Sequence, residues 1–433
     1  MSQKIAYIAM STDLYHSGHI NIINRAAEFG KVIIGVLTDE AIATYKRQPI
    51  LSVEERAQIA RSFKNVDKVV IQNTLDYSEN LRAIKPDFVV HGDDWRSGVQ
   101  HIIREKVISV LAEWGGKLIE VPYTPNVSGD RLSHQFAYIL NTSEQRLSKL
   151  KKLLQLKPYI RAIDVSNGLT GIVAENARVI DAETMAVKEF DAMWVSSLCD
   201  SAFKGKPDIE LVDLTSRIST INEIMEVTTK PIILDGDTGG KIDHFSYHIK
   251  TLERIGVSAI IIEDKTGDKH NSLFGTDAVQ ELDIPERFAL KISAGKHAQV
   301  TRDFMIIARL ESLIAGRGIG DAMSRAKIYI EAGADAIMIH SKEADGSDIF
   351  EFMKQFQRYS KSIPIVLVPT TYNKYTEEEL HEGGAKIIIH ANHLLRSAYP
   401  AMLKTAESIL CDGNSLRASN DYCMPINEVL TFI

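Results

Sequence analysis

Four acidic residues are spaced so that they could bind a hard metal ion. Asp235 and Asp237 flank one glycine directly after an apolar run, Glu263 follows the next apolar run, and Asp208 stands on the preceding loop. Carboxylate oxygens in this number suit Mg²⁺, which often keeps waters and reaches outer carboxylates through them. No cluster of histidines and cysteines competes in the sequence, so we predict a Mg²⁺ site and no zinc site.

Two residues after later apolar runs could hold an anion. Arg309 can bind a phosphoryl or carboxylate group through its planar fork, and His340 can serve as a donor or as a switchable acid. A cation site that faces such a pair indicates a phosphorylated or carboxylated metabolite as the substrate.

A separate group lies near the beginning of the chain. His16 and His19 flank Ser17-Gly18 where the first apolar run gives way to a helical stretch. A strand, a tight turn and a helix N-terminus form a natural phosphate site, because backbone donors and the positive end of the helix dipole face the anion. The histidines can add donors to a triphosphate, and the glycine lets it approach.

The predicted metal and anion residues follow different apolar runs, so the fold must bring the ends of several strands together. Eight short apolar, β-branched runs each precede a loop and usually a helical stretch, which is typical of a (β/α)₈ TIM-type barrel with its active site at the carboxyl ends of the strands. The runs are Arg161–Val165, Ala192–Val195, Pro231–Leu234, Ala259–Ile262, Phe304–Ala308, Ala336–Ile339, Pro364–Val368 and Lys386–Ile389.

The first part of the chain has a different α/β pattern. Five apolar runs alternate with helical stretches, which predicts a Rossmann-like parallel sheet with helices on its faces and a ligand beyond the carboxyl ends of the strands. The runs are Ile5–Met10, Val32–Leu37, Lys68–Ile71, Phe88–His91 and Lys117–Val121.

A short segment is expected to join the two parts. Asn141 and Glu144 resemble a capping box, and leucines then recur at helical spacing until Lys157-Pro158 ends the pattern. We therefore predict an N-terminal domain over residues 1–135, a linker helix over 136–157 and a barrel domain over 158–433.

Composition excludes several classes of protein. With 45% hydrophobic and 25% charged residues among 433, the chain is neither fibrous nor disordered, and it has no apolar run long enough to span a membrane. The net charge of −7 lies mainly in the C-terminal part and suggests no basic face, so nucleic acid is not an expected partner. Three scattered cysteines suit a reducing compartment, and we expect a cytoplasmic location.

Over about residues 158–410 the chain resembles the phosphoenolpyruvate mutases of the isocitrate lyase superfamily. Their signature is matched by Glu263-Asp264-Lys265 and, after five intervening residues, Asn271-Ser272. The accompanying motifs are Trp194-Val195-Ser196-Ser197, Leu234-Asp235-Gly236-Asp237-Thr238-Gly239, Ala308-Arg309-Leu310-Glu311 and Ile339-His340-Ser341-Lys342.

This resemblance implies the interconversion of phosphoenolpyruvate and phosphonopyruvate, which makes a carbon–phosphorus bond. Mg²⁺ would be fixed by Asp235 and outwardly by Asp208, Asp237 and Glu263. Trp194 and the backbone around Ser196-Ser197 would bind the pyruvyl part. The residues implied at the phosphoryl group are Asn271, Ser272, Arg309 and His340, with Lys269 on a gating loop that would exclude water.

Two related activities depend on the residues of the same loop. Isocitrate and methylisocitrate lyases resemble this chain but use a cysteine in a Lys-x-Cys-Gly-His motif, where this chain has Lys269-His270-Asn271-Ser272. Phosphonopyruvate hydrolase shares the metal ligands and differs in the gating loop, where Asn271 favours the mutase. A hydrolase barrel stays open as an alternative.

Over about residues 3–135 the chain resembles the cytidylyltransferase-like nucleotidyltransferases, particularly the glycerol-3-phosphate cytidylyltransferase group. Their His-x-Gly-His signature matches His16 to His19, and Val53-Glu54-Glu55-Arg56, Val66-Asp67-Lys68-Val69 and His91-Gly92-Asp93-Asp94-Trp95 follow in the same order. The resemblance implies attack of a phosphate or phosphonate oxygen on the α-phosphorus of CTP, with His16 and His19 as catalytic residues. The implied nucleotide-binding residues are Asp13, His16, His19, Lys46, Asp94, Trp95, Ser128 and Arg131.

One motif departs from that family. Ser128-Gly129-Asp130-Arg131 lacks the family's pair of hydroxyl residues, and a carboxylate near a triphosphate is unfavourable unless it faces a cation. A nucleotide-binding module without turnover therefore stays open as an alternative.

The combination resembles bifunctional enzymes of phosphonate biosynthesis. It implies that the first domain transfers CMP to an alkylphosphonate such as 2-hydroxyethylphosphonate or 2-aminoethylphosphonate, while the barrel is the mutase. By analogy with tetrameric mutases, we expect a homo-oligomer.

Overall fold

The computed structural model describes residues 4–43, 49–96, 101–122, 141–180, 187–267 and 281–430, apart from the side chains of Asp94, Arg96 and Ile180. The chain forms two compact units. The first consists of Met1–Leu140 with Arg178–Glu189, and the second of Asn141–Ala177 with Phe190–Ile433. The grouping of Arg178–Glu189 with the first unit was not predicted.

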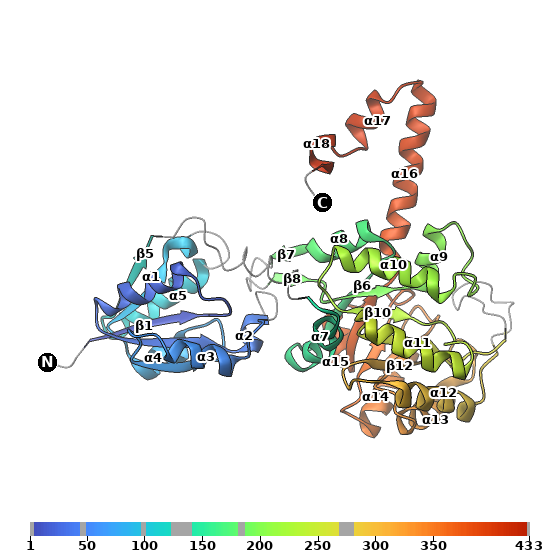
Figure 1. Cartoon of the computed structure of the whole chain (residues 1–433), viewed down its shortest axis with the longest axis horizontal. Helices are drawn as coiled ribbons and strands as arrows, with labels where there is room; N and C mark the ends of the chain where they lie inside the picture. Colours follow the sequence, from blue (N-terminus) through green and yellow to red (C-terminus); the bar gives the residue numbers. More distant parts are fainter. Residues whose placement is uncertain are drawn as a thin grey trace. The chain divides into compact units, whose positions relative to one another are not determined.

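The first unit contains a five-stranded parallel sheet in the order β3-β2-β1-β4-β5, which confirms the expected α/β architecture (Figure 1). Its strands are β1 (Ile5–Met10), β2 (Lys31–Leu37), β3 (Lys68–Gln72), β4 (Phe88–Gly92) and β5 (Lys117–Val121). Its helices are α1 (Ser17–Ala27), α2 (Asp39–Ala43), α3 (Val53–Arg61), α4 (Ser78–Ile84), η1 (Asp93–Arg96) and α5 (His101–Ala112).

Alternating side chains of the central strand explain why helices cover both faces of this sheet. Ile8 of β1 packs with apolar residues of α1 and α3, whereas Tyr7 packs on the other face with residues of α4 and α5. Both faces are therefore buried, as a parallel sheet requires. The antiparallel hairpin of β7 (Arg178–Ile180) and β8 (Val187–Glu189) was not predicted.

The second unit is a closed barrel of eight parallel strands, each overlapping one of the predicted runs (Figure 1). The strands are β6 (Ile160–Asp164), β9 (Ala192–Val195), β10 (Ile232–Asp235), β11 (Ala259–Glu263), β12 (Met305–Leu310), β13 (Ala336–Ile339), β14 (Ile365–Leu367) and β15 (Ala385–His390). They follow one another around the barrel in chain order, so successive strand ends are neighbours.

Helices surround this barrel and continue beyond it. They are α7 (Ser143–Leu156), α8 (Gly168–Asn176), α9 (Ser197–Phe203), α10 (Leu214–Glu226), α11 (Ile242–Ile255), α12 (Pro285–Ala298), α13 (Gly318–Glu331), α14 (Ser347–Tyr359), α15 (Glu377–Gly383), α16 (His393–Asp412), α17 (Leu416–Asp421) and α18 (Ile426–Val429). Among the described residues, no helix combines the length and apolar character needed to cross a membrane.

Helix α7 differs from the expected connecting helix. Its N-cap is Thr142, whose hydroxyl accepts a hydrogen bond from the Gln145 amide at 3.3 Å, so the prediction of an Asn141 cap is wrong. The Asn141 side chain instead accepts a hydrogen bond from Lys149 Nζ. The leucine pattern serves the barrel, because Leu150 and Leu153 pack in the cluster that fills its interior.

Candidate functional site

The predicted metal ligands Asp235, Asp237 and Glu263 lie at the carboxyl ends of β10 and β11, which pair in parallel. All three are buried. The Glu263 amide donates to the Asp237 carbonyl at 2.8 Å, and the Ser197 amide and hydroxyl donate to Asp235 Oδ2 at 3.2 and 3.1 Å. The structure thus brings the predicted substrate-binding serine to the predicted metal ligand.

The backbone that carries these carboxylates is tightly constrained. Asp237 has φ 52°, in the left-handed region that few non-glycine residues adopt, and its amide donates to Asp235 Oδ1 at 3.2 Å. A Cβ atom on Gly236 would lie 2.6 Å from the Ile260 side chain, so only glycine lets β10 and β11 approach here. Such strain is often concentrated at functional sites.

Trp194 and Ser196 lie at the end of the neighbouring strand β9. The Trp194 indole N–H is buried and finds no hydrogen-bond acceptor among the described residues. Ser196 is the N-cap of α9, where its Oγ accepts from the Cys199 amide at 3.1 Å. Both residues therefore lie at the same end of the barrel as the carboxylates.

Asp164, at the end of β6, joins this group although the sequence did not single it out. Its Oδ2 accepts hydrogen bonds from Ser196 Oγ at 2.8 Å, Cys199 Sγ at 2.8 Å and the Asn392 amide at 3.0 Å. Burial raises the pKa of Asp164 to about 6. A carboxylate between two strand ends thus fixes the start of α9.

This pKa predicts a specific pH dependence of stability. Between about pH 4 and 6 folded Asp164 retains a proton that the unfolded chain has lost, so its contribution to stability falls as the pH rises. In Asp164→Asn that titration is absent. The free energy of unfolding of this variant, relative to the parent, should rise by about 3 kcal/mol from pH 4 to 7. Urea unfolding across this range measures it, and a constant difference would contradict it.

Arg309 and His340 lie together beside the carboxylates, as the sequence predicted for an anion site. Arg309 Nη2 is 2.9 Å from His340 Nδ1, and Arg309 Nη1 is 3.4 Å from Glu263 Oε2. Lys265 Nζ is 3.3 Å from Glu263 Oε1 and 3.8 Å from Glu311 Oε2. Two cations and two carboxylates therefore alternate along the ends of β11 and β12.

Electrostatics fixes the charge state of this cluster. Burial opposes ionisation of Glu311, but Arg309, His340 and Lys265 together outweigh it and hold the pKa of the carboxyl well below its ordinary value. Burial and the adjacent Arg309 lower the pKa of His340. Arg309 stays charged, because Glu311 and Glu263 outweigh its burial and raise its pKa. At neutral pH the cluster presents a cationic fork beside a neutral imidazole, an arrangement suited to a phosphoryl group.

The donor set fits Mg²⁺. In the described part of the chain no three His, Cys, Asp or Glu side chains are placed to hold an ion by themselves. Mg²⁺ usually retains several waters and binds through one or two carboxylates plus the substrate, so buried carboxylates on adjacent strand ends suffice. Asp208 lies half-buried between α9 and α10, and its part in such a site stays a prediction. Lys269, Asn271 and Ser272 lie outside the described residues.

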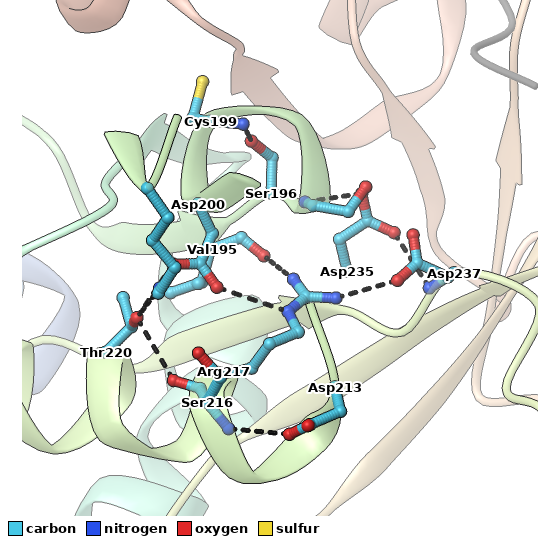
Figure 2. Close-up of polar contacts among 12 residues, drawn as sticks. Val195, Ser196, Cys199, Asp200, Asp213, Ser216, Arg217, Thr220, Asp235 and Asp237 are labelled. Atoms are coloured by element: carbon cyan, nitrogen blue, oxygen red, sulfur yellow. Dashed lines mark hydrogen bonds and ion pairs between the residues drawn. The ribbon is translucent and has the colours of Figure 1, made fainter. Parts of the chain in front are cut away.

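A second residue that the sequence did not single out, Arg217 of α10, contacts the carboxylate loop (Figure 2). Its Nη1 lies 3.1 Å from Asp237 Oδ2, and its Nη2 donates to the Val195 carbonyl at 3.1 Å. One feature of the sequence could have indicated this residue. Arg217 is charged, yet it lies at helical spacing from Ile221 and Ile224, which are buried on α10. A buried charge at such a position requires a partner elsewhere in the fold.

In the first unit, His16 and His19 lie at the N-terminus of α1. His16 is the N-cap, its Nδ1 accepts from the Gly18 amide at 3.2 Å, and the two imidazole rings are 4.0 Å apart. The first turn of α1 has no acidic residue to repel an anion. This helix begins beside the point where the sheet order reverses between β1 and β4, the usual ligand site of such folds.

Other predicted nucleotide-binding residues have structural contacts. Asp13 Oδ1 accepts from the Ile50 and Leu51 amides at 2.8 and 3.0 Å, which anchors the loop before α3. Trp95 is only 1% exposed, donates to Glu120 at 3.0 Å and stacks on His91. Trp95 thus packs in the core and positions His91, and a direct nucleotide contact stays a prediction.

The remaining predicted nucleotide-binding positions give no side-chain geometry. Lys46, Ser128 and Arg131 lie outside the described residues, as do Gly129 and Asp130, and only the backbone of Asp94 is described. One further residue, Arg56, has a structural role that was not predicted from the sequence. Arg56 is fully buried, and its Nη1 donates to the Ser11 and Leu37 carbonyls at 2.6 and 2.7 Å, which joins the loops after β1 and β2.

Comparison with known proteins assigns two regions of the chain to known families. Residues 151–410 match the family model of phosphoenolpyruvate phosphomutase, and residues 11–129 match the cytidylyltransferase-like model. A phosphoenolpyruvate phosphomutase of Tetrahymena pyriformis is 34% identical over 272 residues, covering 63% of this chain and 86% of the relative. A phosphonopyruvate hydrolase of Variovorax sp. is 37% identical over 254 residues, covering 58% and 86%.

A solved structure supports the same relationship. The crystal structure of phosphonopyruvate hydrolase in complex with oxalate and Mg²⁺ superposes with a TM-score of 0.58 at 32% identity, covering 67% of this chain and 94% of the other. The chain therefore belongs to the phosphoenolpyruvate phosphomutase family and carries, ahead of that region, a cytidylyltransferase-like domain.

Proposed function

We propose that this chain is a bifunctional enzyme of phosphonate biosynthesis. Its barrel interconverts phosphoenolpyruvate and phosphonopyruvate, and its first domain transfers CMP from CTP to an alkylphosphonate. The observation that carries the barrel assignment is the contact of Glu263 with Arg309, because it joins a carboxylate site for Mg²⁺ to an anion site within 3.4 Å. An enol and a phosphoryl group, the two fragments of phosphoenolpyruvate, suit two such adjoining sites.

Each end of the substrate has its own binding residues in this proposal. Asp235 would hold Mg²⁺, with Asp208, Asp237 and Glu263 around it, and the ion when bound would polarise the carboxylate and enolate oxygens of the substrate. The backbone around Ser196-Ser197, at the start of α9, would bind the pyruvyl carboxylate together with the Trp194 indole. Ser197 contacts Asp235 directly, so the residues proposed for the pyruvyl carboxylate are coupled to the proposed metal ligand.

The other end receives the phosphoryl group. The oxygen–phosphorus bond of phosphoenolpyruvate breaks, and carbon 3 of the resulting enolate attacks the same phosphorus to form the carbon–phosphorus bond. Since such transfers pass through a loose, metaphosphate-like state, the residues need only hold both fragments and exclude water. Arg309 and His340 hold the phosphoryl oxygens from one side. The family resemblance assigns Asn271, Ser272 and Lys269 to the same phosphoryl group.

The first domain uses the helix N-terminus as its phosphate site. His16 and His19 donate to the phosphates of CTP at the start of α1, and Lys46 and Arg131 add positive charge. An oxygen of the alkylphosphonate attacks the α-phosphorus, the bond to the β-phosphate breaks, and pyrophosphate leaves. A divalent ion, if bound there, would neutralise charge on the phosphates as in other phosphoryl transfers.

Turnover by the first domain is tested with CTP and a panel of phosphonates. We expect pyrophosphate to be released with 2-hydroxyethylphosphonate or 2-aminoethylphosphonate and not with CTP alone. If CTP binds but no phosphonate yields pyrophosphate above background, the domain is the non-catalytic nucleotide-binding module that Gly129-Asp130 left open.

A phosphonopyruvate hydrolase is the second candidate for the barrel, favoured by the 37% identity to the Variovorax enzyme. It would cleave the carbon–phosphorus bond with water and give pyruvate and orthophosphate. Asn271 supports the mutase instead. Colorimetric detection of orthophosphate separates the two, because a mutase releases none from phosphonopyruvate.

We also propose that the chain is a homo-oligomer, most simply a tetramer as the family resemblance implies. Apolar side chains on α16 to α18 are exposed, including Met402, Leu410 and Ile426. Covering such a row by other copies would remove apolar surface from water. Light scattering should give the mass of four 48.3-kDa chains, and the mass of a single chain would contradict assembly.

A further inference from the structure

We infer that Arg217 is a positioning residue of the barrel site, which aligns the Mg²⁺-side carboxylate of Asp237 with the substrate-binding end of β9. The inference rests on the proposed function of the barrel. Arg217 is 4% exposed and lies on α10, outside every motif that carries the family resemblance. It acts through Asp237 and Val195 and does not itself touch the substrate.

One guanidinium joins the two halves of the pyruvyl site (Figure 2). Nη1 is 3.1 Å from Asp237 Oδ2, and Nη2 donates to the Val195 carbonyl at 3.1 Å. Val195 ends β9 and immediately precedes Ser196-Ser197, whereas Asp237 belongs to the loop after β10. A single planar group therefore contacts both the residue that precedes the amides and the outer carboxylate.

Asp237 needs this support because its backbone is strained. Its φ is 52°, and its carbonyl accepts a hydrogen bond from the Glu263 amide at 2.8 Å, so a shift of Asp237 would displace the acceptor of that bond. Movement of Asp237 would therefore also disturb Glu263. Arg217 in this way stabilises two of the carboxylates expected around Mg²⁺.

Arg217 is itself held by Asp200 of α9. Asp200 is 1% exposed, and its Oδ2 lies 3.6 Å from Arg217 Nε. Its other oxygen accepts from Thr220 Oγ1 at 2.8 Å and pairs with Lys204 (Figure 2). Because α9 begins at Ser197, this contact fixes the guanidinium to the same helix whose N-terminus is to bind the substrate.

Lysine cannot replace this arrangement. A guanidinium presents several N–H donors in one plane and can bond Asp237 and Val195 at once, whereas an ammonium is a point donor on a flexible stem. Arg217→Lys keeps the charge near Asp237 and loses the alignment. The variant thus separates positioning from simple neutralisation.

The test is calorimetric titration of Mg²⁺ into the full-length protein in the presence of oxalate, a stand-in for the pyruvyl enolate. We expect Arg217→Lys to weaken Mg²⁺ binding by about 10- to 100-fold, the usual effect of losing a partner that orients metal ligands. The matched control is Arg146→Lys. Arg146 is equally buried, at 3%, but its Nη1 bonds Thr228 and the Lys230 carbonyl ahead of β10, at the other end of the barrel.

The outcomes divide clearly. Mg²⁺ binding by Arg217→Lys within about twofold of the parent, or an equal loss in Arg146→Lys, overturns the inference. If Arg217→Lys does not fold, Asp200→Asn replaces it, since this change releases the guanidinium without removing it. We expect Asp200→Asn to bind Mg²⁺ about 3- to 10-fold more weakly than the parent. Unchanged binding overturns the inference. If the parent protein itself does not bind Mg²⁺ with oxalate, the proposed function of the barrel fails first.

Discussion

Asp235→Ala is expected to reduce turnover of phosphonopyruvate by the barrel at least about 10³-fold. Asp235 ends β10 and is the carboxylate that receives both the amide and the hydroxyl of Ser197. Its loss removes the proposed direct ligand of Mg²⁺ and releases the N-terminus of α9. Steady-state rates at saturating Mg²⁺ measure the effect, with circular dichroism to verify the fold.

A matched control distinguishes the site from general damage. Asp303 precedes β12 and therefore lies at the amino ends of the strands, away from the site. Asp303→Ala should retain most of the barrel activity. If Asp235→Ala kept more than about a tenth of the parent rate, Asp235 would not be the principal ligand.

His16→Ala is expected to reduce CTP-dependent release of pyrophosphate by about 10²- to 10³-fold and to leave the barrel reaction unchanged. His16 caps α1 and lies against His19, so its loss removes a phosphate donor and loosens the first turn of the helix. Both reactions are measured on the same preparation, which makes each site the internal reference for the other.

A second histidine of the same unit supplies the control. His101 begins α5 and has a 52% exposed side chain that approaches Glu105. His101→Ala should retain both activities. A fall of the barrel rate in His16→Ala comparable with the fall in pyrophosphate release would contradict two independent sites.

The strands and strand-end residues were predictable from the sequence because their signals are local. Apolar runs of four to eight residues mark buried strands, and a parallel barrel places whatever follows them at one end. This suffices to bring Asp235, Glu263, Arg309 and His340 to one rim. The contact of Arg309 with His340 follows from the pairing of β12 with β13.

Residues whose contacts cross long stretches of sequence were not predictable. Asp164 bonds the amide of Asn392, 228 positions later, and Arg217 reaches Asp237 from the surface helix α10. Neither partner can be read from spacing. Helix α7 shows the same limit, because its leucines predicted an amphipathic helix but not that the barrel interior would receive them.

Buried aromatic residues reveal another limit of motifs. Trp95 lies within a motif associated with nucleotide binding, yet its indole donates to Glu120 and its ring packs in the core. A residue in a motif can be required for packing or for contact with a ligand, and the motif alone does not distinguish these two roles. At Trp95 the two roles can be distinguished only from the structure, which shows the indole ring stacked on His91.

The central claim, that the barrel moves a phosphoryl group between oxygen and carbon, is tested most directly by phosphorus NMR. Phosphonopyruvate is incubated with Mg²⁺ and the full-length protein. The account predicts that the phosphonate resonance is replaced by that of phosphoenolpyruvate, and that Asp235→Ala produces no such change. Appearance of orthophosphate and pyruvate in place of phosphoenolpyruvate would contradict it and identify a hydrolase.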